Sequence, residues 1–337
     1  MLRRTIFDGV IFGFLFSALA AAVLAPGEEQ LLQLGMVSVW ILTFFAVGCV
    51  LSLVLAGRRV NTLGAALFGP WAQPEVEERP WYQLFWKWQL VTSLGAALVV
   101  AVVKTEFSFI ELFDQQGFAG AVRLFQGLLN PNWDVLPRAV LNIIETIFMA
   151  FLATSLAIPV AFALSFLCAK NIMQGTFARG VYFVLRTFLN VTRSIEALIW
   201  AIIFSVWVGI GPFAGMLALM IHSVASLAKQ YSEMVESVEE GPIEAIESTG
   251  ANKLQTIWYA IVPQVLLPYI SFTVYRWDIN VRMATIIGLV GGGGIGTMLV
   301  QYQGQAMWRE VGCIIVVIAV VVWALDQASA YIREALK

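Results

Sequence analysis

Eight apolar runs, each close to the length of a membrane crossing, constrain most strongly what this chain can fold into. A helix needs about 20 apolar residues to cross the hydrocarbon of a bilayer. Helices satisfy their own backbone hydrogen bonds, which is why they can span a medium without water. The expected spans are 5–25, 34–56, 86–103, 139–168, 181–208, 212–228, 257–281 and 311–332. The sequence therefore predicts an all-α, polytopic membrane protein with about eight transmembrane helices.

The composition agrees with this class and argues against others. Of the 337 residues, 60% are hydrophobic and 12% are charged, whereas a soluble domain carries about 25% charged residues. The net charge of −2 and the lack of a long basic tract argue against a nucleic-acid partner. The three cysteines stand far apart in apolar runs and His222 is the single histidine, so neither a disulfide framework nor a metal site is expected.

The basic residues outside the spans predict how the chain is oriented. An even number of spans puts both termini on one side, where twelve of these lysines and arginines fall, against five on the other side. Cytoplasmic loops carry the excess of Lys and Arg, so both termini are expected in the cytoplasm. The first run follows Arg3 and Arg4 as in a signal peptide, but it is nearly span length and further spans follow. We therefore expect an uncleaved first helix.

Glycines interrupt the apolar stretch 283–300, so it is not a simple span. Gly291, Gly293 and Gly296 match the dinucleotide fingerprint, but the soluble strand–turn–helix context that this signal needs is missing. Unpaired backbone cannot face lipid. We therefore expect a membrane-dipping segment that packs within protein.

A charged break at 236–256 separates two spans and holds five glutamates and one basic residue, Lys253. Pro242 stands where a helix can begin, because the N–H that it lacks is not needed there. Gly250 can end this helix in the left-handed conformation, and Asn252 can cap a second short helix. The pattern predicts a rigid helix–turn–helix that docks a partner, and the alternative is an ordinary solvated loop.

The same stretch carries a family resemblance. Glu244-Ala245-Ile246, followed by Gly250 and Pro263, resembles the EAA loop of binding-protein-dependent ABC importer permeases. The resemblance covers about 135–332 and implies a six-helix, type I importer core whose loop docks on an ATP-hydrolysing subunit. The residues implied in this coupling are Glu240, Pro242, Glu244, Ala245, Ile246, Ser248, Gly250 and Ala251.

A narrower resemblance concerns the cargo. The runs 193–204, 211–230 and 248–296 look like the phosphonate importer permease family, most specifically in the segment YRWDINVRMATIIGLVG. Methionine importer permeases share the glycine-rich segment and are the alternative. The resemblance implies transport of phosphonate or a related phosphorus oxyanion, such as phosphite or phosphate. The phosphonate family commonly has only the six-span core, so the first two spans set this chain apart.

The resemblance also implies an assembly in a bacterial plasma (inner) membrane. Its other members are ABC ATPase subunits, an extracytoplasmic substrate-binding protein, a second copy of this chain and membrane lipid. ATP and Mg belong to the ATPase, and no cofactor is expected on this chain. The expected domains are an N-terminal two-span appendage with a cytoplasmic loop (1–85), a first core span with an external amphipathic segment (86–138), and the permease core (139–337).

Polar residues and glycines near the seventh span are candidates for the translocation path. They are Arg276, Asp278, Asn280, Arg282, Gly291 and Gly293. Ionisable groups at membrane depth are costly and face protein or a water-filled path, and guanidinium groups can bind a tetrahedral oxyanion bidentately. Glycines allow a break that lines such a path. The alternative for Arg282 is structural, because Asp278 lies four residues away and can pair with it on one helix.

Two other functions are an ATP-independent secondary transporter or channel and a membrane enzyme. No lysine follows a glycine, so the sequence has no P-loop and ATP must be hydrolysed by a partner. A secondary transporter would want carboxylates deep in its spans, where Glu145 and Glu196 are the few candidates. An enzyme would need a convergent catalytic cluster, which is missing. We therefore expect a transport subunit rather than an enzyme.

Overall fold

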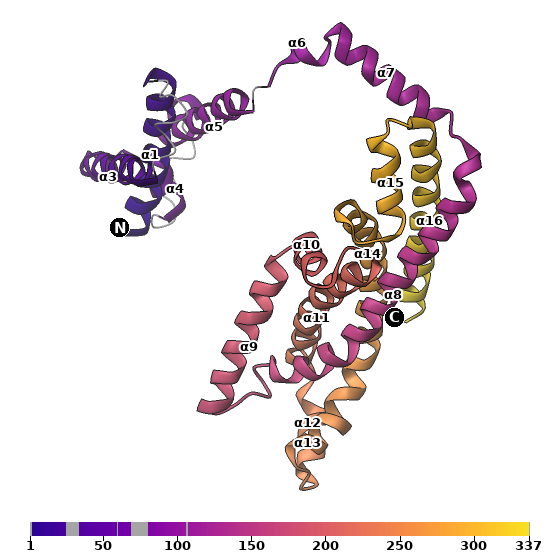
Figure 1. Cartoon of the computed structure of the whole chain (residues 1–337). Helices are drawn as coiled ribbons and strands as arrows, with labels where there is room; N and C mark the ends of the chain where they lie inside the picture. The colour runs from indigo at the N-terminus through magenta and orange to yellow at the C-terminus, as the bar shows by residue number, and fades with distance from the viewer. Residues whose placement is uncertain (1, 25–33, 59, 69–79, 106, 337) are drawn as a thin grey trace. The chain divides into compact units, whose positions relative to one another are not determined.

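The computed structural model describes residues 2–24, 34–58, 60–68, 80–105 and 107–336. Within these ranges every regular element is a helix, as predicted (Figure 1). The chain forms two compact units, Met1–Asp114 and Gln115–Lys337. Part of the cytoplasmic loop expected in the N-terminal appendage, residues 69–79, lies outside the described ranges.

The first unit holds the helices of the N-terminal appendage and two more, α5 and α6. Its elements are α1 (Leu2–Leu24), α3 (Leu34–Gly57), α4 (Leu63–Phe68), η2 (Trp81–Gln83), α5 (Phe85–Lys104) and α6 (Phe109–Leu112). α1 packs along α3 and also contacts α4 and α5. The sequence groups α5 with the later spans, but its contacts place it in this unit, so the boundary between the units falls inside the expected segment 86–138.

A buried carboxylate holds the first unit together. Asp8 in α1 is fully buried and accepts hydrogen bonds from the Thr62 hydroxyl, from Gly64 N at 2.7 Å and from the Ser52 hydroxyl at 3.2 Å. Arg4 Nε lies 4.0 Å from the same carboxylate. A buried charge is tolerated when it is hydrogen-bonded and paired. Asp8 therefore links α1 to α3 and to the start of α4.

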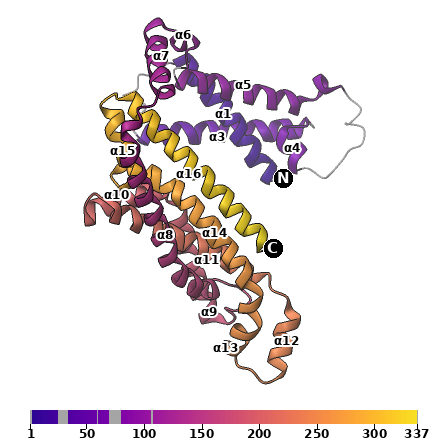
Figure 2. The same cartoon turned by 90° about the vertical axis from the view of Figure 1, so that its right-hand side faces the viewer.

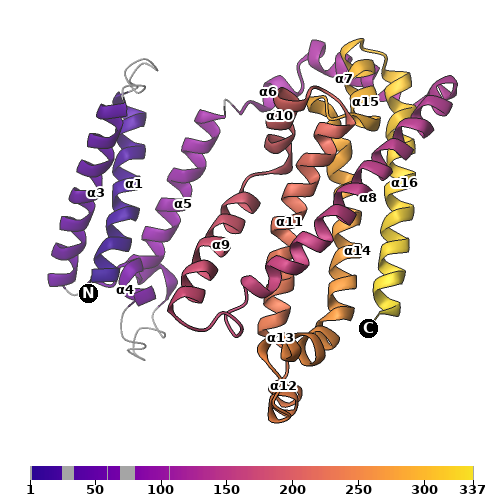
Figure 3. The same ribbon diagram turned by 60° about the horizontal axis from the view of Figure 1, so that its bottom comes forward.

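The second unit is a bundle in which the long helices α8, α11, α14 and α16 lie side by side (Figure 2, Figure 3). Its elements are α7 (Gln115–Leu129), η3 (Trp133–Val135), α8 (Leu136–Leu167), α9 (Thr176–Ser194), α10 (Ala197–Val208), α11 (Pro212–Glu236), α12 (Glu240–Ser248), α13 (Lys253–Thr256), η4 (Ile257–Ile261), α14 (Val262–Ile287), η5 (Gly288–Val290), α15 (Gly294–Gly304) and α16 (Trp308–Ala335). α12 and α13 lie at one end of the bundle, and α10 and α15 lie toward the opposite end (Figure 3).

Small residues bring the central helices of this bundle together. Ala150, Ala153 and Ala157 of α8 are fully buried, and Ala214 and Ala218 of α11 are as well. Membrane helices associate through such positions because a small side chain lets two backbones approach closely. The spacing of these alanines along each helix explains why α8 and α11 pack along one another.

Among the residues that the structure describes, five helical segments are long and apolar enough to cross a membrane, and the number is six if a bent pair counts as one span. The five segments are Phe85–Val103, Trp133–Leu167, Pro212–Glu236, Lys253–Val290 and Trp308–Ala335. The runs expected at 5–25 and 34–56 form α1 and α3, but the side chains of residues 19–40 lie outside the described ones. The total of eight spans therefore stays a prediction.

The span expected over 181–208 is not one continuous helix, and the two helices that form it count as a span only as a bent pair. α9 and α10 meet at a bend of 90°, where Glu196 has an extended backbone with φ −63° and ψ 145°. Side chains accompany the backbone groups at the break: the His222 ring Nδ1 lies 3.2 Å from Ile195 O, and Trp200 Nε1 donates to Thr192 O at 3.4 Å. Such partners satisfy backbone groups that the break leaves without a helical hydrogen bond, which is why a membrane helix can tolerate it.

Candidate functional site

The helix–turn–helix predicted in the charged break is confirmed. α12 starts at Glu240 with Pro242 in its first turn, and Gly250 follows it with φ +83°. Asn252 Oδ1 accepts from Gln255 N at 3.0 Å, while Gln255 Oε1 accepts from Asn252 N at 2.9 Å. This reciprocal capping box fixes the start of α13.

α12 is held on one side and open on the other. Glu240, Ile243, Glu244 and Glu247 line a cavity of about 330 Å³ that the helix shares with η4 and with the turn after α8. None of the residues of α12 is buried. At 3.6 residues per turn, Ala245 lies on the side away from the cavity and Ser248 lies at the edge of that side, and both are exposed. α12 therefore presents a face of small side chains that no other described element covers.

The return from α12 to the bundle passes through a widened turn. Ile257–Ile261 form a π-helical turn directly before Pro263 of α14. Proline has no N–H and its ring crowds the carbonyl four residues earlier, which a widened turn can accommodate. Close by, Gln264 Oε1 accepts from Glu239 N at 3.0 Å, so the first residues of α14 also hold the start of α12.

A polar cluster lies where α8, α11 and α14 cross. Arg276 is only 7% exposed, and its Nε donates to the Ser223 hydroxyl at 3.2 Å. Asn280 is fully buried, and its Nδ2 donates to the hydroxyls of Thr154 and Ser223, each at 2.8 Å. Among the described residues, Arg276 Nη2 and Asn280 Oδ1 have no hydrogen-bond partner. Because an unpaired buried polar group is costly, these two atoms are open to a polar ligand.

Arg282 is engaged by two carboxylates. Its Nη2 donates to Asp278 Oδ2 at 2.7 Å, which is the pairing that the spacing in α14 allows. Its Nη1 also donates to both carboxylate oxygens of Asp326 in α16, at 3.0 and 3.2 Å. Asp326 is not among the sequence candidates, although a lone acid inside the apolar run 311–332 is a signal that could have found it.

The glycine-rich segment forms a tight turn between α14 and α15. Gly291 and Gly293 have φ of +86° and +79°. A Cβ at Gly291 would lie 2.7 Å from the Ile210 side chain, and one at Gly293 would lie 2.7 Å from Pro212 N. Glycine is therefore required at both positions, for its backbone conformation and for the close approach.

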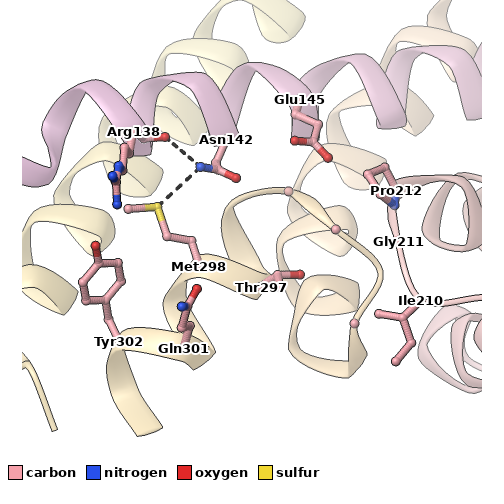
Figure 4. A pocket seen from close by; sticks show the side chains of 13 residues that line it. Arg138, Asn142, Glu145, Ile210, Gly211, Pro212, Thr297, Met298, Gln301 and Tyr302 are labelled. Atoms are coloured by element: carbon pink, nitrogen blue, oxygen red, sulfur yellow. Dashed lines mark hydrogen bonds between the residues drawn. The ribbon is translucent and has the colours of Figure 1, made fainter. Parts of the chain in front are cut away.

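This turn borders a polar cavity of about 390 Å³. Arg138, Asn142 and Glu145 follow one another along α8, across from residues of α15 (Figure 4). The cavity residues on α15 are Thr297, Met298, Gln301 and Tyr302. The sequence candidates are thus divided among three places: this cavity holds Gly291 and Gly293, Arg276 and Asn280 lie in the polar cluster, and Asp278 pairs with Arg282, which in turn binds Asp326 of α16.

The fold resembles a known transporter. The chain aligns with the inward-facing methionine ABC transporter MetNI with a TM-score of 0.53 and 22% identity, covering 61% of this chain and 99% of that chain. A family model described as "Binding-protein-dependent transport system inner membrane component" matches residues 161–336. This chain belongs to that family. The resemblance in the charged break is confirmed, and so is the all-α permease fold.

Three relatives of this permease are named for phosphorus transport. It is 32% identical to the phosphite transport system permease protein PtxC of Stutzerimonas stutzeri, over 72% of this chain and 88% of PtxC. It is 32% identical to the phosphate-import permease protein PhnE of Mycolicibacterium smegmatis, over 73% of this chain and 45% of that protein. PhnE2 of Escherichia coli K12, named for a cryptic phosphonate transport system, is 44% identical over 35% of this chain and 98% of PhnE2.

The family defines what kind of subunit this is. A binding-protein-dependent permease is an inner-membrane component of an ABC transporter, and the ATPase activity resides in a partner subunit. Dependence on a binding protein implies a substrate-binding partner as well. The permease therefore forms the membrane part of a transporter that hydrolyses ATP elsewhere.

Proposed function

We propose that this permease imports phosphonate, or a closely related oxyanion such as phosphite or phosphate, at the expense of ATP. The similarity to relatives named for phosphite, phosphate and phosphonate transport carries the proposal. Two relatives named for D-methionine transport are more distant, at 28% identity over 168 residues and 26% over 197 residues. The segment around Arg276 and Arg282 agrees, since it carries the cationic groups that a phosphorus oxyanion needs inside a membrane.

Arg276 is the better of the two arginines for a place in the anion path. Arg282 already binds two carboxylates, whereas Arg276 Nη2 is buried and open. Asn280 and Ser223 would orient a tetrahedral oxyanion beside that guanidinium. Gly291 and Gly293 would line the way in, because they border the polar cavity beside α15.

The exposed face of α12 would dock in a groove of the ATPase. The residues of this contact and its supporting turns are Glu240, Pro242, Glu244, Ala245, Ile246, Ser248, Gly250 and Ala251. Small side chains let the helix pack closely in a groove of the ATPase. The capped turns on either side keep α12 rigid, so that it can transmit a displacement of the ATPase to the membrane helices. The C-terminal end of α16 lies toward the same end of the unit as α12 and α13 (Figure 3), which supports a cytoplasmic C-terminus.

A second copy of the permease would complete the path. The side chains of Arg282 and Asp326 are 40% and 43% exposed within one chain, and they border a hollow with Trp323 and Ile318 of α16. Charged groups inside an apolar span do not face lipid. A partner permease, with the water-filled path between the two copies, would cover this face.

Growth of a bacterial strain tests the cargo. The strain lacks its own importers for phosphorus oxyanions and expresses the permease with its ATPase and binding protein. We expect growth on phosphonate or phosphite as the phosphorus source, and none when Arg276→Gln replaces the wild type. Arg309→Gln is the matched control, because Arg309 is exposed and outside the polar cluster. Rescue of a methionine-import defect without growth on either phosphorus source would refute the proposal.

A further inference from the structure

One ion pair joins α9 to the base of α12. Glu236 is the last residue of α11, four positions before the first residue of α12. Its Oε1 accepts a hydrogen bond from Arg186 Nη1 of α9 at 2.6 Å and a second one from Lys170 N at 3.0 Å. The two side chains are 21% and 22% exposed. The pair is therefore partly shielded from water, and its geometry is that of a strong, charge-assisted hydrogen bond.

The same guanidinium reaches a third helix. Arg186 Nη1 also donates to Cys168 O at the end of α8, at 3.0 Å. Close by, Asn171 Nδ2 donates to Val235 O of α11 at 2.7 Å. The end of α8, the turn that follows it, α9 and the end of α11 are thus bound together at the level where α12 begins.

α9 has few other anchors within its unit. Only Leu189 and Thr192 of its residues are buried, while Phe183, Val184 and Phe188 are each more than 60% exposed. A helix with so few buried contacts is free to shift with the contacts that do hold it. The ion pair holds the middle of α9 at Arg186, and the C-terminal end of the helix is the 90° bend before α10.

The bend lies beside the proposed anion path. Ile195 O at the bend lies 3.2 Å from the ring Nδ1 of His222 in α11, and Ser223, the next residue, binds Arg276. α10 then packs into the same buried cluster as Val281 and Ala284 of α14. A shift of α9 would therefore reach the helix positions next to Arg276.

We infer that the Arg186–Glu236 pair is a positioning contact that carries displacement of α12 through α9 to the bend beside Arg276. The inference rests on the proposed docking of α12 on the ATPase. The backbone connects α12 directly to α11 and, through α13 and η4, to α14, but α9 is not next to α12 in the chain. The ion pair provides the missing connection to α9. Closure of the ATPase would therefore move α9, α11 and α14 together.

The test uses the intact complex of permease, ATPase and binding protein in proteoliposomes. Arg186→Gln and Glu236→Gln are made singly, and the amount of substrate imported per ATP hydrolysed is measured. We expect ATP hydrolysis stimulated by the binding protein to continue in both variants. The ratio of substrate imported to ATP hydrolysed should fall at least about fivefold, which is the lower end of the effects that coupling between two sites produces. The exchange Arg186→Glu with Glu236→Arg is expected to restore most of the ratio.

Lys229 provides a matched control on α11. It forms an ion pair with Glu233 at 3.7 Å within one helix, but the charge of Glu233 also acts on Arg186 of α9. Lys229→Gln alone is therefore the control, and it is expected to leave the ratio unchanged.

Two results would overturn the inference. The first is a wild-type ratio in both single variants, and the second is an equal fall of hydrolysis and uptake, which indicates a merely structural pair. If a single variant does not assemble into the complex, the variant with the exchanged charges is the test. If that variant assembles but its ratio of import to hydrolysis stays low, the proposed role of the pair is refuted. Absence of ATP-dependent uptake by the wild-type complex would instead refute the proposed function itself.

Discussion

Gly296 of α15 marks a close approach between the two arms of the glycine turn. A Cβ at this position would overlap Thr285 O and lie 2.9 Å from the Cα of Gly288. Non-bonded carbon atoms normally lie about 3.5–4.0 Å apart, so the contact with Gly288 alone would push α15 away from α14 by at least roughly half an ångström to one ångström, and the closer contact with Thr285 O would add to this shift. Overpacking of this kind costs about 1–3 kcal/mol. We expect Gly296→Ala to loosen the turn that borders the polar cavity.

Gly304→Ala in the same helix is the control, because a Cβ there would meet no atom within 4 Å. The assay is thermal unfolding of the purified permease together with its uptake activity. A unit of this size loses roughly 2–4 °C of Tm per kcal/mol, so we expect about 2–12 °C for Gly296→Ala and little change for Gly304→Ala. Equal Tm values and equal uptake for the two variants would show that the close approach is not a constraint.

Three further substitutions have defined outcomes. Asp8→Ala leaves three buried donors unpaired, so it should destabilise the first unit by about 3 kcal/mol, seen as faster proteolysis of residues 1–114; unchanged proteolysis would contradict this. Gly250→Ala forces a left-handed backbone at a cost of roughly 1–2 kcal/mol and should reduce co-purification of the ATPase, while undiminished co-purification would argue against a rigid α12. Arg282→Gln leaves the buried Asp278 and the exposed Asp326 uncompensated and should lower stability by about 1–3 kcal/mol, most of it from Asp278; adding Asp326→Asn should recover part of this loss, and no recovery would contradict the pairing.

Local signals in the sequence predict the coupling region well. Pro242, Gly250 and Asn252 act on their immediate neighbours, so a helix start, a left-handed stop and a cap can be placed without knowledge of the rest of the chain. The Asp278–Arg282 pair is equally local, because both residues lie one turn apart on α14. These features depend on spacing alone.

Features that depend on distant partners could not be predicted in the same way. The apolar run over 181–208 continues across the bend, and hydropathy does not register the extended backbone of Glu196. Asp326 meets Arg282 only because α16 packs on α14. Likewise, Glu236 is one of five glutamates in the charged break 236–256, and only the folded bundle distinguishes it by bringing it to Arg186.

ATP-dependent uptake by the reconstituted complex tests the central claim most directly. The permease, its ATPase and its binding protein are placed in proteoliposomes, and accumulation of labelled phosphite or phosphonate is followed with and without ATP. The proposed function predicts accumulation that requires all three proteins and ATP and that unlabelled phosphonate, but not methionine, inhibits. Accumulation without ATP, or inhibition by methionine and not by phosphonate, would contradict it.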